Sequence, residues 1–209
     1  MNRYVAEFLG TFALALAVSL SLAGKFPVPT PVIAALALGV CVYTLGDISG
    51  THINPAITLA LASIGKIDIR NALFYLAAQF AGGATAMFVS QLMLGTRPAV
   101  TAVDSAAVFG AEALGTFFLA TGVCSVVLGK APGPAAGLTI GGSLLLGISI
   151  AAAVSNGVLN PAVALGIGSF SVVYALGPIV GAVAAMQLYR YMASPKPESA
   201  AARRAASAN

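Results

Sequence analysis

The sequence carries one three-residue motif twice, each time at the start of an apolar segment too short to cross a membrane. Asn54-Pro55-Ala56 begins the first segment, and Asn160-Pro161-Ala162 begins the second, 106 positions later. Residues 6–12 and 111–117 share a further motif, Ala-Glu-x-Leu-Gly-Thr-Phe, at a displacement of 105 positions. These pairs predict a tandem repeat with halves 1–104 and 105–193. Interrupted apolar segments at matching places in two halves indicate a solute pathway near the middle of a bilayer.

Composition makes lipid the expected solvent. Charged residues make up 8% of the 209 residues and hydrophobic residues 59%, whereas an ordinary soluble domain has about 25% charged residues. Six apolar stretches are each close to the roughly 20 residues that cross the hydrocarbon core as a helix. Leucine, alanine and isoleucine favour helices over the alternating strands of a barrel, so we predict an all-α membrane protein with six spanning helices. The expected spans are 4–23, 31–48, 71–95, 108–129, 135–155 and 171–192.

The basic residues predict the orientation of the chain in the bilayer. If both termini lie on one side, eight of the ten Lys and Arg residues share that side, and only Lys25 and Arg97 face the other. By the positive-inside rule the richer side is cytoplasmic. From Ser194 to residue 209, Pro, Ser, Ala and Arg predict a disordered cytoplasmic tail. The sequence has no basic stripe with interleaved aromatic residues, so we do not expect nucleic acid as a partner.

Each Asn-Pro-Ala motif has the composition of a helix start. Proline suits the first turn because the N–H it lacks would be unsatisfied there, and asparagine before it is a good N-cap. Pro55 with Ala56 and Pro161 with Ala162 are therefore expected to begin two half-helices. A helix of about 10 residues rises about 15 Å, so two that enter from opposite faces meet at the bilayer centre.

Two helix starts that meet at the centre favour a particular class of solute. The amides of Asn54 and Asn160 supply N–H donors, and the helix N-termini carry partial positive charge. This arrangement suits a neutral solute with an acceptor oxygen, and it opposes a cation or a proton that moves along a chain of water.

With these two motifs the chain resembles the aquaporin and aquaglyceroporin family, also called major intrinsic proteins, from about Glu7 to Tyr189. Residues 49–58 (Ser-Gly-Thr-His-Ile-Asn-Pro-Ala-Ile-Thr) resemble its first pore loop, and residues 177–182 resemble its sixth helix. The resemblance implies six helices plus two re-entrant half-helices in an inverted repeat, assembled as a homotetramer in the bilayer. It also implies roles for particular residues: central donors at Asn54 and Asn160, and pore loops held by the carboxylates of Glu7 and Glu112. A proton relay at the two glutamates is the alternative.

The resemblance also places His52 in the cytoplasmic half of the pore, with a purely structural hydrogen bond as the alternative. It further identifies a departure from the family pattern. Most members have Arg directly after the second Asn-Pro-Ala, where this chain has Val163. By their spacing from the two motif asparagines, Ala34, Ile148 and Gly157 correspond to the other three positions of the family's constriction. An apolar filter without Arg should be wide. It resembles that of bacterial members linked to metalloids, so we expect a bacterial cell membrane and glycerol- or arsenite-like solutes, with a leaky water and glycerol pore as the alternative.

Other functional classes are less well supported by the sequence. It shows no nucleophile–base pair, phosphate loop or metal-ligand spacing, so we expect neither an enzyme nor a cofactor or metal. An alternating-access transporter also uses inverted repeats and broken helices, but it normally needs an ionisable coupling site near the midplane. A non-conducting membrane scaffold of the same fold is the third class. Saturable flux would indicate a transporter, and absence of flux would indicate a scaffold.

Overall fold

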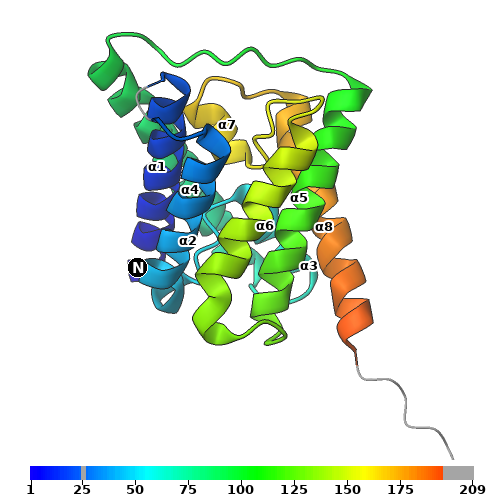
Figure 1. Cartoon of the computed structure of the whole chain (residues 1–209). Helices are drawn as coiled ribbons and strands as arrows, with labels where there is room; N and C mark the ends of the chain where they lie inside the picture. The colour runs from blue at the N-terminus through cyan, green and yellow to red at the C-terminus, as the bar shows by residue number, and fades with distance from the viewer. Residues whose placement is uncertain (25–26, 195–209) are drawn as a thin grey trace, which may run out of the picture.

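A computed structural model describes residues 1–24 and 27–194 of the chain, and these residues form a bundle of helices (Figure 1). Its six long helices are long and apolar enough to cross a membrane. The described residues contain no strand. In chain order the elements are α1 (Asn2–Leu22), α2 (Thr30–Ser49), α3 (Pro55–Ser63), α4 (Ile69–Leu94), α5 (Ala106–Val127), the 3-10 helix η1 (Gly133–Ala135), α6 (Ala136–Ala151), α7 (Pro161–Gly166) and α8 (Val172–Ala193).

The predicted all-α fold with six spanning helices and two half-helices is confirmed, and most helix ends agree within two residues. The fifth span is the exception, because α6 ends at Ala151 rather than near Ser155. Ser155 belongs instead to the following loop, where its hydroxyl bonds to Glu112. Tertiary hydrogen bonding of the loop therefore ends the helix earlier than apolar composition alone predicts.

The half-helix α3 has nine residues, but α7 has only six, which is shorter than the sequence indicated. The chain leaves α7 through Gly168, whose φ of 76° is a left-handed conformation that suits glycine. The amide of Gly168 donates to Leu165 O and that of Ser169 donates to Ala164 O, which satisfies the last carbonyls of the helix. This local glycine stop was not used in the sequence prediction.

The two halves of the chain interlock through their half-helices. Within each half the first helix packs on the second and on the last, so the α1 contacts with α2 and α4 correspond to the α5 contacts with α6 and α8. Each half-helix packs mainly on the last helix of the other half, α3 on α8 and α7 on α4. In Figure 1, α7 lies in the upper part of the bundle and α3 in the lower part.

Small residues permit this close packing. A Cβ at Gly83 of α4 would collide with the carbonyl of Ala162 in α7, and one at Gly181 of α8 would collide with the carbonyl of Ala113 in α5. Close approach through glycine and alanine is the usual means by which membrane helices associate. Gly83 therefore allows the half-helix α7 to approach α4 closely, and Gly181 allows the spanning helices α5 and α8 to do the same.

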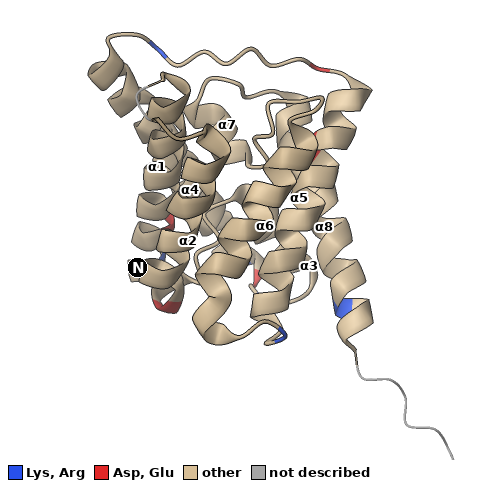
Figure 2. Ribbon diagram, viewed as in Figure 1, with Lys and Arg blue, Asp and Glu red and all other residues tan. Residues whose placement is uncertain are grey.

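Charge is nearly absent from the middle of the bundle. Figure 2 shows Lys, Arg, Asp and Glu mainly toward the helix ends and in the connecting segments. The start of α1 and the end of α8 both lie toward the lower end in this view.

The division into repeats at residue 104 falls in the connection between α4 and α5 and stays a prediction. Of the expected tail only Ser194 is described, and the rest lies outside the described residues.

Candidate functional site

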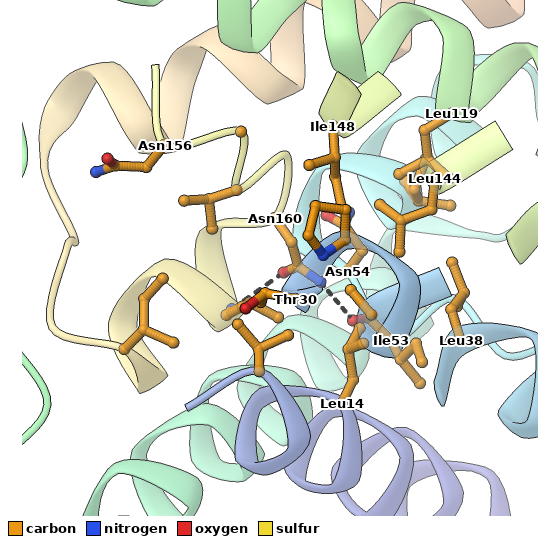
Figure 3. Close-up of a pocket in the computed structure, with 18 of the residues that line it drawn as sticks. Leu14, Thr30, Leu38, Ile53, Asn54, Leu119, Leu144, Ile148, Asn156 and Asn160 are labelled. Atoms are coloured by element: carbon orange, nitrogen blue, oxygen red, sulfur yellow. Dashed lines mark hydrogen bonds between the residues drawn. The ribbon is translucent and has the colours of Figure 1, made fainter. Parts of the chain in front are cut away.

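A cavity of about 230 Å³ lies between the two half-helices and the long helices around them. Figure 3 shows Asn54 and Asn160 close together at its centre, with leucine and isoleucine side chains around them. All four predicted constriction residues border this cavity, and so does His52. The other apolar side chains in its wall include Leu14, Val18, Leu38, Leu119, Val123, Ile140 and Leu144.

The two asparagines cap the half-helices, and this fixes the orientation of their amides. Asn54 Oδ1 accepts from Ala56 N at 2.9 Å, and Asn160 Oδ1 accepts from Ala162 N at 3.0 Å and from Val163 N at 3.2 Å. Because each oxygen faces the N–H groups of its own helix, each amide nitrogen must face away from it. Both side chains are 4% exposed.

The nitrogen of each asparagine amide donates a hydrogen bond to the loop in the other half of the chain. Asn54 Nδ2 donates to Leu159 O at 2.9 Å, and Asn160 Nδ2 donates to Ile53 O at 2.9 Å. The sequence predicted two donors that face one lumen, but it did not predict this reciprocal exchange. An amide nitrogen carries two hydrogens, so one hydrogen of each asparagine remains for the cavity.

The loops that lead into the half-helices repeat residue by residue at a displacement of 106. Ile53 has φ 35° and its counterpart Leu159 has φ 57°, while Thr51 has φ 48° and its counterpart Gly157 has φ 61°. A β-branched residue such as Ile53 rarely adopts a left-handed conformation, and such strain persists only where the surroundings enforce it. Something in each half must therefore hold the loop in place.

Buried carboxylates hold both loops. Glu7 Oε1 accepts from His52 N at 2.9 Å, and Glu7 Oε2 accepts from Ile53 N at 2.6 Å. Glu112 takes the N–H groups of Val158 and Leu159 at 3.0 and 2.7 Å in the same way. Both carboxylates are completely buried. Their hydrogen bonds satisfy loop amides that have no helical partner at this depth.

The repeated Ala-Glu-x-Leu-Gly-Thr-Phe motif has a second use in this contact. Its glycine, Gly10 in α1 and Gly115 in α5, lies against the side chain of the strained residue. A Cβ at Gly10 would lie 2.6 Å from Ile53 Cγ2, and one at Gly115 would lie 2.7 Å from Leu159 Cδ2. Glutamate and glycine three positions apart on one helix face therefore bind the amide and the side chain of one loop residue.

The first loop has more polar support than the second. Ser49 Oγ donates to Glu7, as Ser155 Oγ does to Glu112. Gln79 Nε2 adds a further bond to Glu7 at 2.7 Å and another to Thr58 Oγ1 at 2.8 Å. None of these three residues was predicted from the sequence to support a loop. The 106-residue spacing of the serines was a usable signal, whereas Gln79 is marked only as a polar residue within an apolar span.

The predicted constriction contains no charged or aromatic side chain. Ala34, Ile148 and Val163 are all buried and border the cavity. A Cβ at Gly157 would lie 3.2 Å from Ile148 Cγ2, so these two positions are packed together. Val163 belongs to the first turn of α7, where its N–H bonds to the Asn160 cap.

His52 borders a second cavity as well, a polar vestibule of about 640 Å³. Its imidazole lies edge-on to the Tyr75 ring, with 4.9 Å between ring centroids. Asp68 stands at the rim of this vestibule and caps α4, and its hydrogen bonds from the backbone and then the side chain of Asn71 lower its pKa. Arg3 and Lys66 also border the vestibule.

Groups of at least three His, Cys, Asp or Glu side chains with metal-binding geometry do not occur in the described parts of the chain. Cys41 and Cys124 are buried free thiols in different spanning helices. The polar groups that border the central cavity are thus amide, imidazole, hydroxyl and backbone groups, which can orient a solute without reacting with it.

A model of the major intrinsic protein family matches residues 1–189. The chain belongs to this family. Aquaporin NIP1-1 from Zea mays is 34% identical over 211 residues, which cover 90% of this chain and 74% of that protein. Aquaporin AqpM from Methanothermobacter thermautotrophicus is 31% identical and is matched over 92% of this chain and 98% of its own.

The X-ray structure of the aquaglyceroporin from Plasmodium falciparum has the same fold, with a TM-score of 0.70 over 90% of this chain and 94% of that one. Sequence identity is 20%, so this likeness concerns the fold alone. Major intrinsic proteins are channels rather than enzymes, and the chain is accordingly a multi-pass membrane channel for water or small solutes.

Replacing Glu112 with glutamine should loosen the second loop. The amide can accept at only one of its two positions, so one buried loop N–H would face another donor, at a cost of about 1–3 kcal/mol. We expect a lower midpoint of thermal unfolding in detergent and reduced solute flux in liposomes. Asp47→Asn, which makes the same chemical change at an exposed position of α2, is the control. A Glu112→Gln midpoint equal to that of the control would contradict this role for the carboxylate.

Proposed function

We propose that the chain is a passive channel for water and small neutral solutes of glycerol or arsenous acid size, with a wide, apolar filter that lacks Arg. The observation that carries the proposal is the central cavity, in which two cross-bonded asparagines are surrounded by apolar side chains. In this proposal Asn54 and Asn160 donate to an oxygen of the solute as it passes the middle of the membrane.

Neutral solutes fit this lining better than ions do. The amide hydrogens that remain on the two asparagines are donors, and the N-termini of the adjoining half-helices carry partial positive charge. A cation would lose its hydration in an apolar passage and meet partial positive charge at the centre. A hydroxylated neutral solute gives up less hydration and gains an acceptor contact.

The filter composition supports passage of solutes larger than water. Ala34 and Gly157 are the two smallest residue types, and Val163 stands where, by the family resemblance, most members have Arg. Apolar walls weaken the binding of water, but a wide opening remains hydrated more readily than a narrow one. We infer that width has the larger effect here.

We further propose the setting in which the channel works. Both termini face the cytoplasm, as the distribution of Lys and Arg supports, and the vestibule beside His52 is then the inner mouth. The membrane is the cell membrane of a bacterium, and the assembly is a homotetramer with one pore in each subunit. The repeats correspond to residues 1–104 and 105–193, with Glu7 and Glu112 as loop-holding carboxylates.

Stopped-flow shrinkage of proteoliposomes tests the proposed function directly. Water, glycerol, urea and arsenite are compared in one panel against empty liposomes. We expect fast, non-saturating flux of glycerol and arsenite with a low activation energy. Saturation with rising solute concentration would indicate an alternating-access transporter, and rates equal to those of empty liposomes would indicate a scaffold.

Val163→Arg should shift selectivity toward water. Arginine would narrow the constriction and add a fixed positive charge with several donors. Glycerol and arsenite flux should then fall several-fold more than water flux in the same stopped-flow assay. Val163→Met, which adds length without charge, separates the effect of width from that of charge.

Misfolding must be excluded first, because an arginine turned toward lipid costs at least about 2.5–3.5 kcal/mol. Expression level and oligomer size in detergent are therefore measured before flux. A folded Val163→Arg protein with the wild-type ratio of glycerol to water flux would refute a filter role for this position.

A further inference from the structure

The hydroxyl of Thr58, in the half-helix α3, makes three close polar contacts. Gln79 Nε2 lies 2.8 Å from Thr58 Oγ1, Asn54 O lies 3.1 Å from it, and His52 Nδ1 lies 3.2 Å from it. A hydroxyl has one hydrogen to donate and two lone pairs that accept. Three contacts therefore use its full capacity, and the other groups decide which contact takes the hydrogen.

The direction of two of these bonds follows from their surroundings. Gln79 Nε2 also lies 2.7 Å from Glu7 Oε2, and the reversed amide would place its oxygen against that carboxylate oxygen. Gln79 must therefore donate to Thr58. The carbonyl of Asn54 can only accept, so it takes the hydrogen of the hydroxyl.

The remaining contact then determines which ring nitrogen of His52 carries the hydrogen. With one lone pair of Thr58 Oγ1 already used by Gln79, His52 Nδ1 must donate to the other. If Thr58 donated to His52 instead, its oxygen would face the Asn54 carbonyl oxygen at 3.1 Å with no hydrogen between them. The bond made by one ring nitrogen sets the state of the other.

We propose that Gln79 and Thr58 are positioning residues that hold neutral His52 as its Nδ1–H tautomer, which leaves Nε2 as a bare acceptor for O–H groups of the permeating solute. Nε2 has no hydrogen-bond partner among the described residues, and His52 borders both the central cavity and the inner vestibule. The solute would thus meet donors at the asparagines and then an acceptor at His52. This second step rests on the proposed function, whereas the tautomer does not.

The hydrogen-bonded set of His52, Thr58 and Gln79 has no counterpart in the second half of the chain. At the 106-residue displacement of the loops, Val158 stands in place of His52 and Ala164 in place of Thr58. The last helices correspond at a displacement of 99, because Tyr75 and Tyr174 each use their hydroxyl to bind the preceding loop, at Ser49 O and Asn156 N. That displacement places Pro178, which has no polar side chain, opposite Gln79.

Nitrogen-15 NMR of the full chain in lipid tests the tautomer, with labelled histidine at about pH 8, where a histidine of ordinary pKa near 6.5 is neutral. His52 is the only histidine in the sequence, so a single pair of ring signals is observed. We expect the attached hydrogen on Nδ1 in the wild type and in Thr58→Ser, which keeps the hydroxyl. Thr58→Val should move the hydrogen largely to Nε2.

Thr85→Val is the matched control, because the Thr85 hydroxyl bonds only to a carbonyl of its own helix, Ala81 O at 2.8 Å. Relative to this control, glycerol flux through Thr58→Val should fall about threefold to tenfold, the range for loss of one hydrogen bond. If Thr58→Val does not fold, the wild-type and Thr58→Ser spectra decide the tautomer.

The possible failures are distinguishable. A hydrogen on Nε2 in the wild type would overturn the inference and leave the proposed function intact. A switched tautomer in Thr58→Val with glycerol flux equal to that of Thr85→Val would overturn the acceptor role of Nε2. A wild-type protein that passes no glycerol would refute the proposed function without altering the tautomer assignment.

Discussion

A backbone amide inside a bilayer must find its hydrogen-bond partner within the protein, and this requirement governs the central region of the structure. The two loops that enter the half-helices cannot pair with a strand or continue a helix. Glu7 and Glu112 accept their amides. An intramembrane carboxylate is costly unless it is fully partnered, so the loops and the glutamates each supply what the other lacks. The strained residues Ile53 and Leu159 are the local consequence.

The two loops and their half-helices are also bonded to each other. Each asparagine caps its own half-helix through its oxygen and binds the opposite loop through its nitrogen, so these bonds fix the position of the two half-helices relative to each other at the central cavity. Only a few amide hydrogens remain for a solute, and apolar walls surround them. In the function proposed above, such a passage would discriminate by size and hydrogen bonding and would penalise charge.

The sequence predicted what depends on length, periodicity and internal repetition. The six spans, the helix starts at Pro55 and Pro161 and the family all followed from such patterns. The early end of α6 and the short α7 did not, because they depend on Ser155 binding Glu112 and on the stop at Gly168. The reciprocal asparagine bonds and the Gln79 contacts were missed for a similar reason. They join residues far apart in sequence whose mutual orientation only the folded chain defines.

The most direct test of this account is to place a negative charge at the crossing of the half-helices. Asn160→Asp keeps an oxygen that can cap α7 but removes the donor that binds Ile53 O and faces the passage. Cation conductance and glycerol flux would be measured in the same proteoliposomes, after oligomer size and thermal stability have been matched to the wild type. The account predicts higher cation conductance and slower glycerol flux. A folded variant with unchanged glycerol flux and no added conductance would contradict a pathway lined by the two asparagines.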